Sequence, residues 1–115
     1  MRILLDKNVP RGVRRILISH TVETVDAGGW STLKNGELLK AAEIAQFDVL
    51  VTADQNIIYQ QNRGSQRVSL VVLNTHNWAV IKEQLSKIAT AVNAAKSANY
   101  TLVEFERQRP RRFRD

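Results

Sequence analysis

Three acidic residues of this sequence are candidates for binding a metal ion. Asp6 closes the apolar run RILLD, Asp54 closes DVLVTAD, and Glu37 lies near the start of an amphipathic stretch. Carboxylates placed together repel one another, and a protein tolerates this mainly where a metal ion or a proton offsets the charge. Such oxygen ligands suit Mg²⁺ or Mn²⁺. Brought together as catalytic residues, Asp6, Glu37 and Asp54 would hold one or two of these ions and direct a metal-activated water at a phosphodiester.

Four further residues are candidates for contacts with a substrate. Asn56 follows Asp54 by two positions and Asn74 ends the run VVLN, so their amide oxygens could adjust the waters around an ion. Lys7 and Arg11 could position a phosphate group. Each of these residue types also has an ordinary structural use, since Asn favours turns and Asp and Glu favour the first turn of a helix.

Other catalytic chemistries find less support in the sequence. The chain has no cysteine, which excludes thiol nucleophiles and thiolate zinc sites. His20 and His76 could form a metal-free acid–base pair. However, His20 precedes a predicted strand and His76 follows another, so a parallel sheet places them at opposite edges.

The alternation of apolar runs and amphipathic stretches predicts the elements that position these residues. Strands are predicted at Arg2–Leu5, Thr21–Val25, Asp48–Thr52, Ser69–Leu73 and Tyr100–Phe105, and helices at Pro10–Ser19, Asn35–Ala45, Asp54–Gln61 and Trp78–Ser97. Right-handed crossovers then give an α/β fold: an open, mostly parallel five-stranded sheet with helices on both faces, in three layers. Such sheets bind ligands at the carboxyl ends of their strands. If the first and third strands are neighbours, Asp6 and Asp54 open into one crevice. Trp30 and Trp78 are expected to pack on the core.

Composition and charge narrow the class of partner. A chain of 115 residues with a hydrophobic fraction of 43% is long enough for one folded domain, predicted at 1–106, with an Arg-rich tail at 107–115. Seventeen Lys and Arg against eleven Asp and Glu give a formal charge of +6, which favours a polyanion such as RNA, or an acidic protein. The N-terminal apolar run is too short for a signal peptide or a membrane span. We therefore expect a cytoplasmic protein without membrane contact, and the sequence leaves a homodimer open.

Three segments resemble the motifs of a compact PIN-like, Rossmannoid nuclease family, a domain of unknown function that includes toxins of bacterial toxin–antitoxin pairs. They are RILLDKNVP, GGWSTLKNGELLKAA and DVLVTADQN, and the similarity covers most of residues 1–75. The resemblance implies a Mg²⁺- or Mn²⁺-dependent endoribonuclease that acts on RNA, is silenced by an acidic antitoxin, and uses Asp6, Glu37 and Asp54 as metal ligands. Lys7 and Asn35 stand where this family often has acids, so the cluster is less negative than usual.

Two other classes remain open from the sequence. A non-catalytic module on the same fold could bind nucleic acid or an antitoxin through Arg11, Arg14, Arg15 and the tail. A phosphoacceptor receiver domain would use Asp54 to accept a phosphoryl group and Thr75 to sense it. Against the receiver, Asp6 is followed by lysine rather than a second acid, and no lysine ends the fifth predicted strand.

Overall fold

Five parallel strands form the centre of the molecule. The structure is a computed structural model that describes residues 1–33, 35–55, 67–95 and 100–106. The strands are β1 (Arg2–Leu5), β2 (Thr21–Thr24), β3 (Val49–Thr52), β4 (Ser69–Leu73) and β5 (Tyr100–Val103), paired in the order β2-β1-β3-β4-β5 with every neighbouring pair parallel. The predicted open parallel sheet is confirmed, and β1 and β3 are neighbours.

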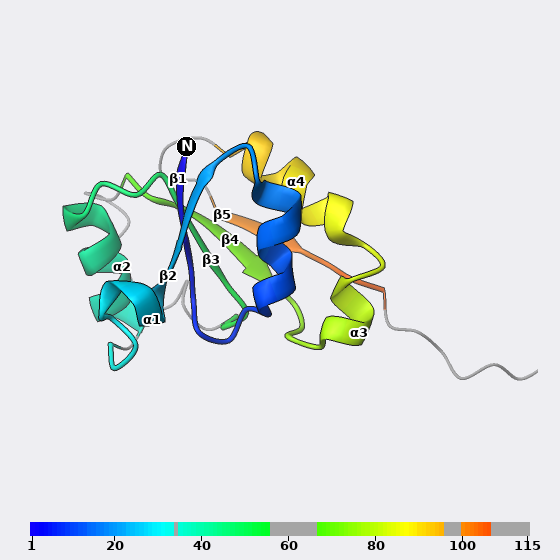
Figure 1. The fold of residues 1–115 in the computed structure, drawn as a ribbon, viewed down its shortest axis with the longest axis horizontal. Helices are drawn as coiled ribbons and strands as arrows, with labels where there is room; N and C mark the ends of the chain where they lie inside the picture. Colours follow the sequence, from blue (N-terminus) through cyan, green and yellow to red (C-terminus); the bar gives the residue numbers. More distant parts are fainter. Residues whose placement is uncertain (34, 56–66, 96–99, 107–115) are drawn as a thin grey trace, which may run out of the picture.

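Helices cover both faces of this sheet (Figure 1). They are the 3₁₀ helix η1 (Arg11–Leu17) and the α-helices α1 (Val25–Gly28), α2 (Asn35–Ile44), α3 (Trp78–Ile81) and α4 (Leu85–Asn93). Figure 1 shows α1 and α2 on one side of the strands and α3 and α4 on the other, with η1 beside α4. The three-layer arrangement is therefore confirmed. Within the described ranges, no helix is long and apolar enough to cross a membrane.

The alternation of side chains along the strands divides the core into two halves. Ile3, Leu5 and Val51 pack with residues of η1, α3 and α4, whereas Leu4 and Leu50 pack with residues of α1 and α2. Every residue of β3 and β4 is buried, as expected for central strands that are covered on both faces. The carboxyl ends of these strands consequently have fixed positions at one edge of the sheet.

Several predicted boundaries differ from the structure by one or two residues. β2 ends at Thr24 rather than Val25, because the Thr24 hydroxyl accepts a hydrogen bond from Ala27 N at 3.2 Å and begins the short helix α1. Gly29 ends this helix with a positive φ of 81°, a conformation that favours glycine. Helix α2 ends at Ile44, one residue before the predicted end, β3 begins one residue later than predicted, and β5 ends at Val103 rather than Phe105.

The single helix predicted at Trp78–Ser97 is wrong over its described residues, and its last two residues lie outside them. The chain forms α3 and α4 instead, separated at Lys82–Gln84, where Gln84 leaves helical geometry with φ −134° and ψ 30°. The Gln84 side chain exchanges two hydrogen bonds with the backbone of Glu106, at 3.1 and 3.3 Å. This break allows both Ile81 and Ile88 to be fully buried.

Two other predicted elements differ or lie outside the described residues. The helix predicted at Pro10–Ser19 is a 3₁₀ helix over Arg11–Leu17. The helix predicted at Asp54–Gln61 begins with Asp54 and Gln55, which are not helical, and its remainder lies outside the described residues, as does the tail at 107–115. Trp30 and Trp78 both pack against the core, as expected, and Trp30 meets the Phe47 ring edge-on with centroids 5.8 Å apart.

Candidate functional site

The candidate site lies at the carboxyl edge of the sheet, between β1 and β3. The chain passes from β1 to β2 on one side and reaches β3 on the other, so the strand order reverses between these two strands. Open α/β sheets bind ligands at such a position. Asp6 N donates to Val51 O at 2.9 Å, which extends the β1–β3 ladder one residue beyond β1. Asp6 and Thr52 thus stand next to each other where the two strands end.

Asp6 is the most buried of the three predicted acids. Its exposed fraction is 9%, and Thr52 beside it is fully buried. Asp6 Oδ2 accepts a hydrogen bond from the Thr52 hydroxyl at 2.7 Å, and Oδ1 accepts one from Lys7 N at 2.7 Å. Hydrogen bonds to an ionised carboxylate are short and strong. Each oxygen keeps a further lone pair, so the carboxylate is oriented by these donors and can still bind a cation.

Two side chains hold backbone N–H groups at this edge. Asn8 Oδ1 accepts from Ala53 N at 3.0 Å, which ties the loop after β1 to the loop after β3, and the Thr52 hydroxyl accepts from Asp54 N at 3.1 Å. One oxygen atom of Thr52 therefore contacts both the Asp6 carboxylate and the backbone N–H of Asp54. Neither Asn8 nor Thr52 was predicted from the sequence, although Thr52 is a polar residue at the end of an apolar run and Asn8 follows the end of β1 by three residues.

The three predicted acids do not form one cluster. Asp54 is half-buried and Glu37 is exposed in the first turn of α2, and both make contacts of their own. Within the part of the chain that the structure describes, no group of three His, Cys, Asp or Glu side chains is close enough to hold a metal ion. The Thr52 hydroxyl therefore links the Asp6 carboxylate to the backbone N–H of Asp54, but Asp6, Glu37 and Asp54 do not come together as one set of three metal ligands.

The two basic candidates lie at the surface near this edge. Lys7 is exposed, and its Nζ donates to Ser31 O at 3.2 Å. In the described residues no ion pair joins Lys7 to Asp6, so the lysine does not neutralise that carboxylate directly. Arg11 is exposed at the first position of η1, which begins at the same edge.

The two asparagine candidates have different outcomes. Asn74 Oδ1 accepts from Phe105 N at 3.0 Å, and Asn74 Nδ2 donates to Phe105 O at 3.5 Å. Its amide therefore holds the segment that follows β5, a structural use that the sequence did not reveal. Asn56 lies outside the described residues.

The histidines lie at opposite edges, as the predicted topology requires. His20 precedes β2, where its Nδ1 is 3.3 Å from the N-terminal nitrogen of Met1 and its Nε2 is 3.0 Å from Asn93 Oδ1. His76 is exposed beyond the end of β4. A single phosphate cannot lie between them, so the metal-free histidine mechanism has no geometric support.

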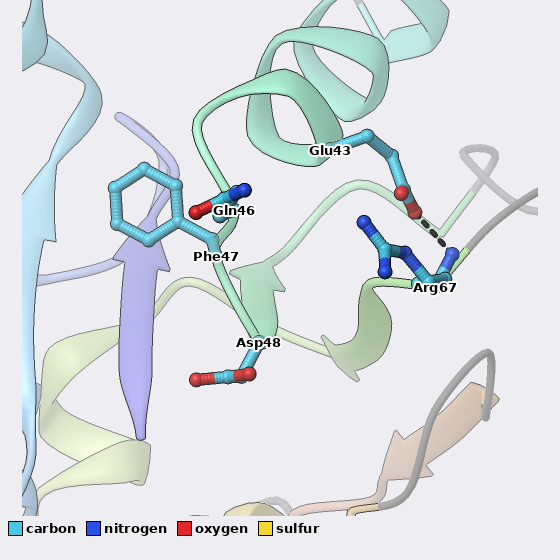
Figure 2. A pocket seen from close by; sticks show the side chains of 5 residues that line it. All are labelled: Glu43, Gln46, Phe47, Asp48 and Arg67. Carbon is cyan, nitrogen blue, oxygen red and sulfur yellow. Dashed lines mark hydrogen bonds between the residues drawn. The ribbon is translucent and has the colours of Figure 1, made fainter.

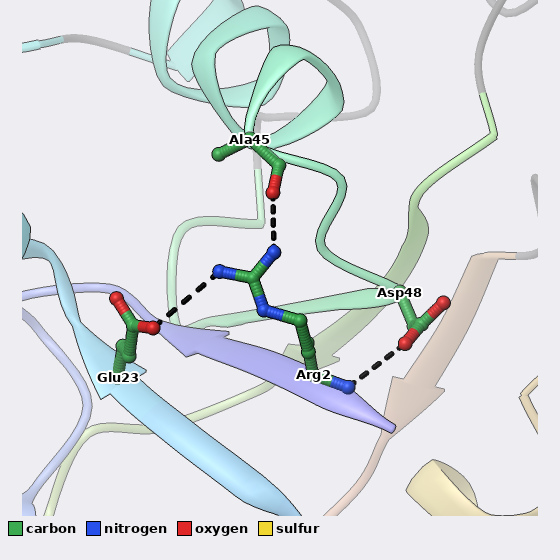
Figure 3. A network of polar contacts seen from close by, with 4 residues as sticks. All are labelled: Arg2, Glu23, Ala45 and Asp48. Atoms are coloured by element: carbon green, nitrogen blue, oxygen red, sulfur yellow. Dashed lines mark hydrogen bonds and ion pairs between the residues drawn. The ribbon is translucent and has the colours of Figure 1, made fainter.

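The amino edge of the sheet holds a separate polar network, which Figure 3 shows. The Arg2 guanidinium donates to Ala45 O and pairs with Glu23 at 3.4 Å, and Arg2 N donates to Asp48 Oδ2 at 2.8 Å. The same guanidinium lies 4.4 Å from the centroid of the Phe47 ring. These contacts fasten the start of β1 to its neighbours.

An adjoining pocket of about 220 Å³ is lined by Glu43, Gln46, Phe47, Asp48 and Arg67. As Figure 2 shows, the Glu43 carboxylate accepts a hydrogen bond from Arg67 N, and it also accepts one from Val68 N at 2.6 Å. The two carboxylates that line this pocket, those of Glu43 and Asp48, thus accept hydrogen bonds from backbone N–H groups. These hydrogen bonds hold the segments that lead into β3 and β4. The pocket is not the predicted site.

Comparison with known proteins does not identify the chain. No family model, no curated protein and no solved structure matches it.

Proposed function

We propose that this protein is a PIN-like endoribonuclease that depends on Mg²⁺ or Mn²⁺, and that it is the toxin of a toxin–antitoxin pair. The observation that carries the proposal is the buried Asp6 residue, whose carboxylate is oriented at the β1–β3 edge and is linked through the Thr52 hydroxyl to the backbone N–H of Asp54. The resemblance of residues 2–10, 28–42 and 48–56 to PIN-like motifs supports it. The formal charge of +6 favours RNA as the substrate.

In this proposal the metal ion is held by two carboxylates rather than three. Mg²⁺ in proteins commonly binds one or two carboxylates and keeps several waters. Asp6 and Asp54 would be the direct ligands, and Glu37 would act on the ion through water. A bound ion would lower the pKa of its water and offset the charge that develops on the phosphate.

The remaining residues of the site orient these groups and attract the substrate. Thr52 and Lys7 N hold the two oxygens of Asp6, which fixes the carboxylate before any ligand arrives. The Lys7 ammonium is exposed and makes one hydrogen bond, to Ser31 O, so it can turn toward a phosphate at little cost. Arg11 adds a second exposed cation at this edge. An acidic antitoxin segment would be attracted by the same charges.

Cleavage of single-stranded RNA of mixed sequence tests the proposal. The purified protein should cut this RNA with Mn²⁺ or Mg²⁺, and a chelator should stop the reaction. Asp6→Asn and Asp54→Asn should each lower the rate roughly 100-fold or more, because a bound ion contributes several kcal/mol to the transition state. Asp26→Asn, which removes an exposed carboxylate of α1, is the matched control. Cleavage that survives the chelator, or that is the same in all three variants, would contradict the proposal.

A non-catalytic binding module is the first alternative. Arg11, Arg14 and Arg15 are all exposed on η1, a cluster that could bind phosphate groups without cutting them. RNA binding that weakens with salt, together with no cleavage under any metal condition, would favour this function.

A phosphoacceptor receiver domain is the second alternative. The observed strand order is the one that receivers share with flavodoxin-like folds, and Asp54 follows β3. However, the described residues after β5 are Glu104, Phe105 and Glu106, without the lysine that receivers use. Phosphorylation by acetyl phosphate in the wild type, lost in Asp54→Asn, would favour the receiver.

A further inference from the structure

A groove of about 380 Å³ lies between η1 and β2. It is lined by Arg14, Arg15, Leu17, Ile18, His20 and Val22, and we call it the β2 groove. Ile18 is 85% exposed, the most exposed of the large hydrophobic residues in the described part of the chain. Arg14 and Arg15 are also exposed. The β2 groove thus combines apolar surface with two positive charges.

The backbone of β2 adds hydrogen-bonding groups to this surface. β2 is an outer strand of the sheet (Figure 1) and pairs with β1 alone. Thr21 N donates toward β1, to Met1 O at 3.0 Å. In a parallel ladder alternate residues face the same neighbour, so Glu23 also faces β1 and the N–H and C=O of Val22 point away from the sheet. Among the described residues, no hydrogen bond satisfies these two groups.

An unpaired strand edge is a template for another strand, and here it borders the β2 groove at Val22. We propose that the β2 groove and the edge of β2 bind an extended acidic segment of a partner protein, which adds a strand to the sheet. Side chains of an extended segment alternate between two faces. Apolar residues on one face would pack against Ile18 and Val22, and acidic residues would meet Arg14 and Arg15.

The charges and the apolar surface of the β2 groove favour an acidic peptide over two other occupants, a second copy of the chain and a nucleic acid. A second copy of the chain, joined by two-fold symmetry, would bring two copies of the same arginine pair to one interface, which is unfavourable. A nucleic acid would use the arginines but would leave the exposed Ile18 side chain and the Val22 backbone groups without partners. An acidic peptide uses all of them. The β2 groove is separate from the carboxyl edge, so this inference does not depend on RNA cleavage.

Titration of the ¹⁵N-labelled protein with a synthetic peptide tests the inference, because NMR detects the weak binding expected of so small an interface. The peptide has about seven residues of alternating aspartate and valine, long enough to cover β2, which spans ~13 Å. We expect the amide signals of Ile18 and Val22 to shift. The double variant Arg14→Ala/Arg15→Ala should weaken binding roughly fivefold or more, at about two- to fivefold for each exposed arginine. Methylation of alternate peptide nitrogens should abolish binding.

The matched control is Lys40→Ala/Lys82→Ala, which removes the same charge from two exposed positions outside the groove. It should retain most of the affinity. The inference is overturned if millimolar peptide shifts no signal, if both double variants lose equal affinity, or if the methylated peptide binds as well as the parent. It is also overturned if single-stranded RNA shifts these amides where the peptide does not, or if sedimentation shows a dimer that Ile18→Asp dissociates.

Discussion

Replacing Thr52 with valine removes one hydroxyl from the end of β3 and preserves the shape of the side chain. Thr52 is fully buried, and its hydroxyl donates to Asp6 Oδ2 at 2.7 Å and accepts from Asp54 N at 3.1 Å. A hydrogen bond to a charged group contributes about 1.5–3 kcal/mol to stability and one between neutral groups about 1 kcal/mol. Asp6 keeps its bond from Lys7 N. We therefore expect Thr52→Val to lower the free energy of unfolding by about 2.5–4 kcal/mol.

Urea unfolding followed by circular dichroism measures this loss, which should lower the midpoint by about 1–2 M for a slope of about 2 kcal/mol/M. Thr52→Ser keeps the hydroxyl and removes one methyl group, so it should cost only about 1 kcal/mol. Thr90→Val changes an exposed threonine of α4 and should stay within about 0.5 kcal/mol of the wild type. If Thr52→Val costs no more than Thr52→Ser, the hydrogen bonds of Thr52 do not stabilise this edge and the reasoning is wrong.

Three further substitutions test local features of the fold. Gly12→Ala places a Cβ 2.2 Å from an atom of the Trp78 ring, so we expect a loss of about 1–3 kcal/mol in thermal unfolding; an unchanged melting temperature would contradict the close approach. Gly29→Ala meets no neighbouring atom but must adopt φ 81°, which should cost about 1–2 kcal/mol; a gain in stability would refute the left-handed conformation. Asn74→Ala removes the acceptor of Phe105 N, so the Phe105 amide should exchange its hydrogen faster while amides of β3 do not; equal protection in both proteins would refute this role.

The central sheet could be predicted because each strand is marked by a local run of apolar residues in the sequence. β1 and β4 have the predicted bounds, since an apolar run with polar residues at both ends defines a buried strand. The break between α3 and α4 could not be predicted in this way. The apolar spacing continues through Lys82–Gln84 without glycine or proline, and the break depends on hydrogen bonds between Gln84 and the distant Glu106.

Part of the candidate site could be predicted from the order of the strands. Asp6 and Asp54 follow neighbouring parallel strands, so topology alone places them at one edge. The position of Glu37 depends on how α2 packs over the sheet, which no local pattern encodes, and the structure leaves this side chain exposed. Thr52 was missed because a threonine at the end of an apolar run is common, and its importance comes from the Asp6 oxygen beside it.

The location of a bound Mn²⁺ ion tests the central claim most directly, because it needs no knowledge of the RNA target. Mn²⁺ is paramagnetic and broadens the NMR signals of nearby amides in the ¹⁵N-labelled protein. We predict that broadening is strongest at the amides of Asp6, Lys7 and Asp54, that Asp6→Asn removes it, and that Asp26→Asn does not. Broadening centred on the pocket of Glu43 and Asp48, or an unchanged pattern in Asp6→Asn, would contradict a metal site at the β1–β3 edge.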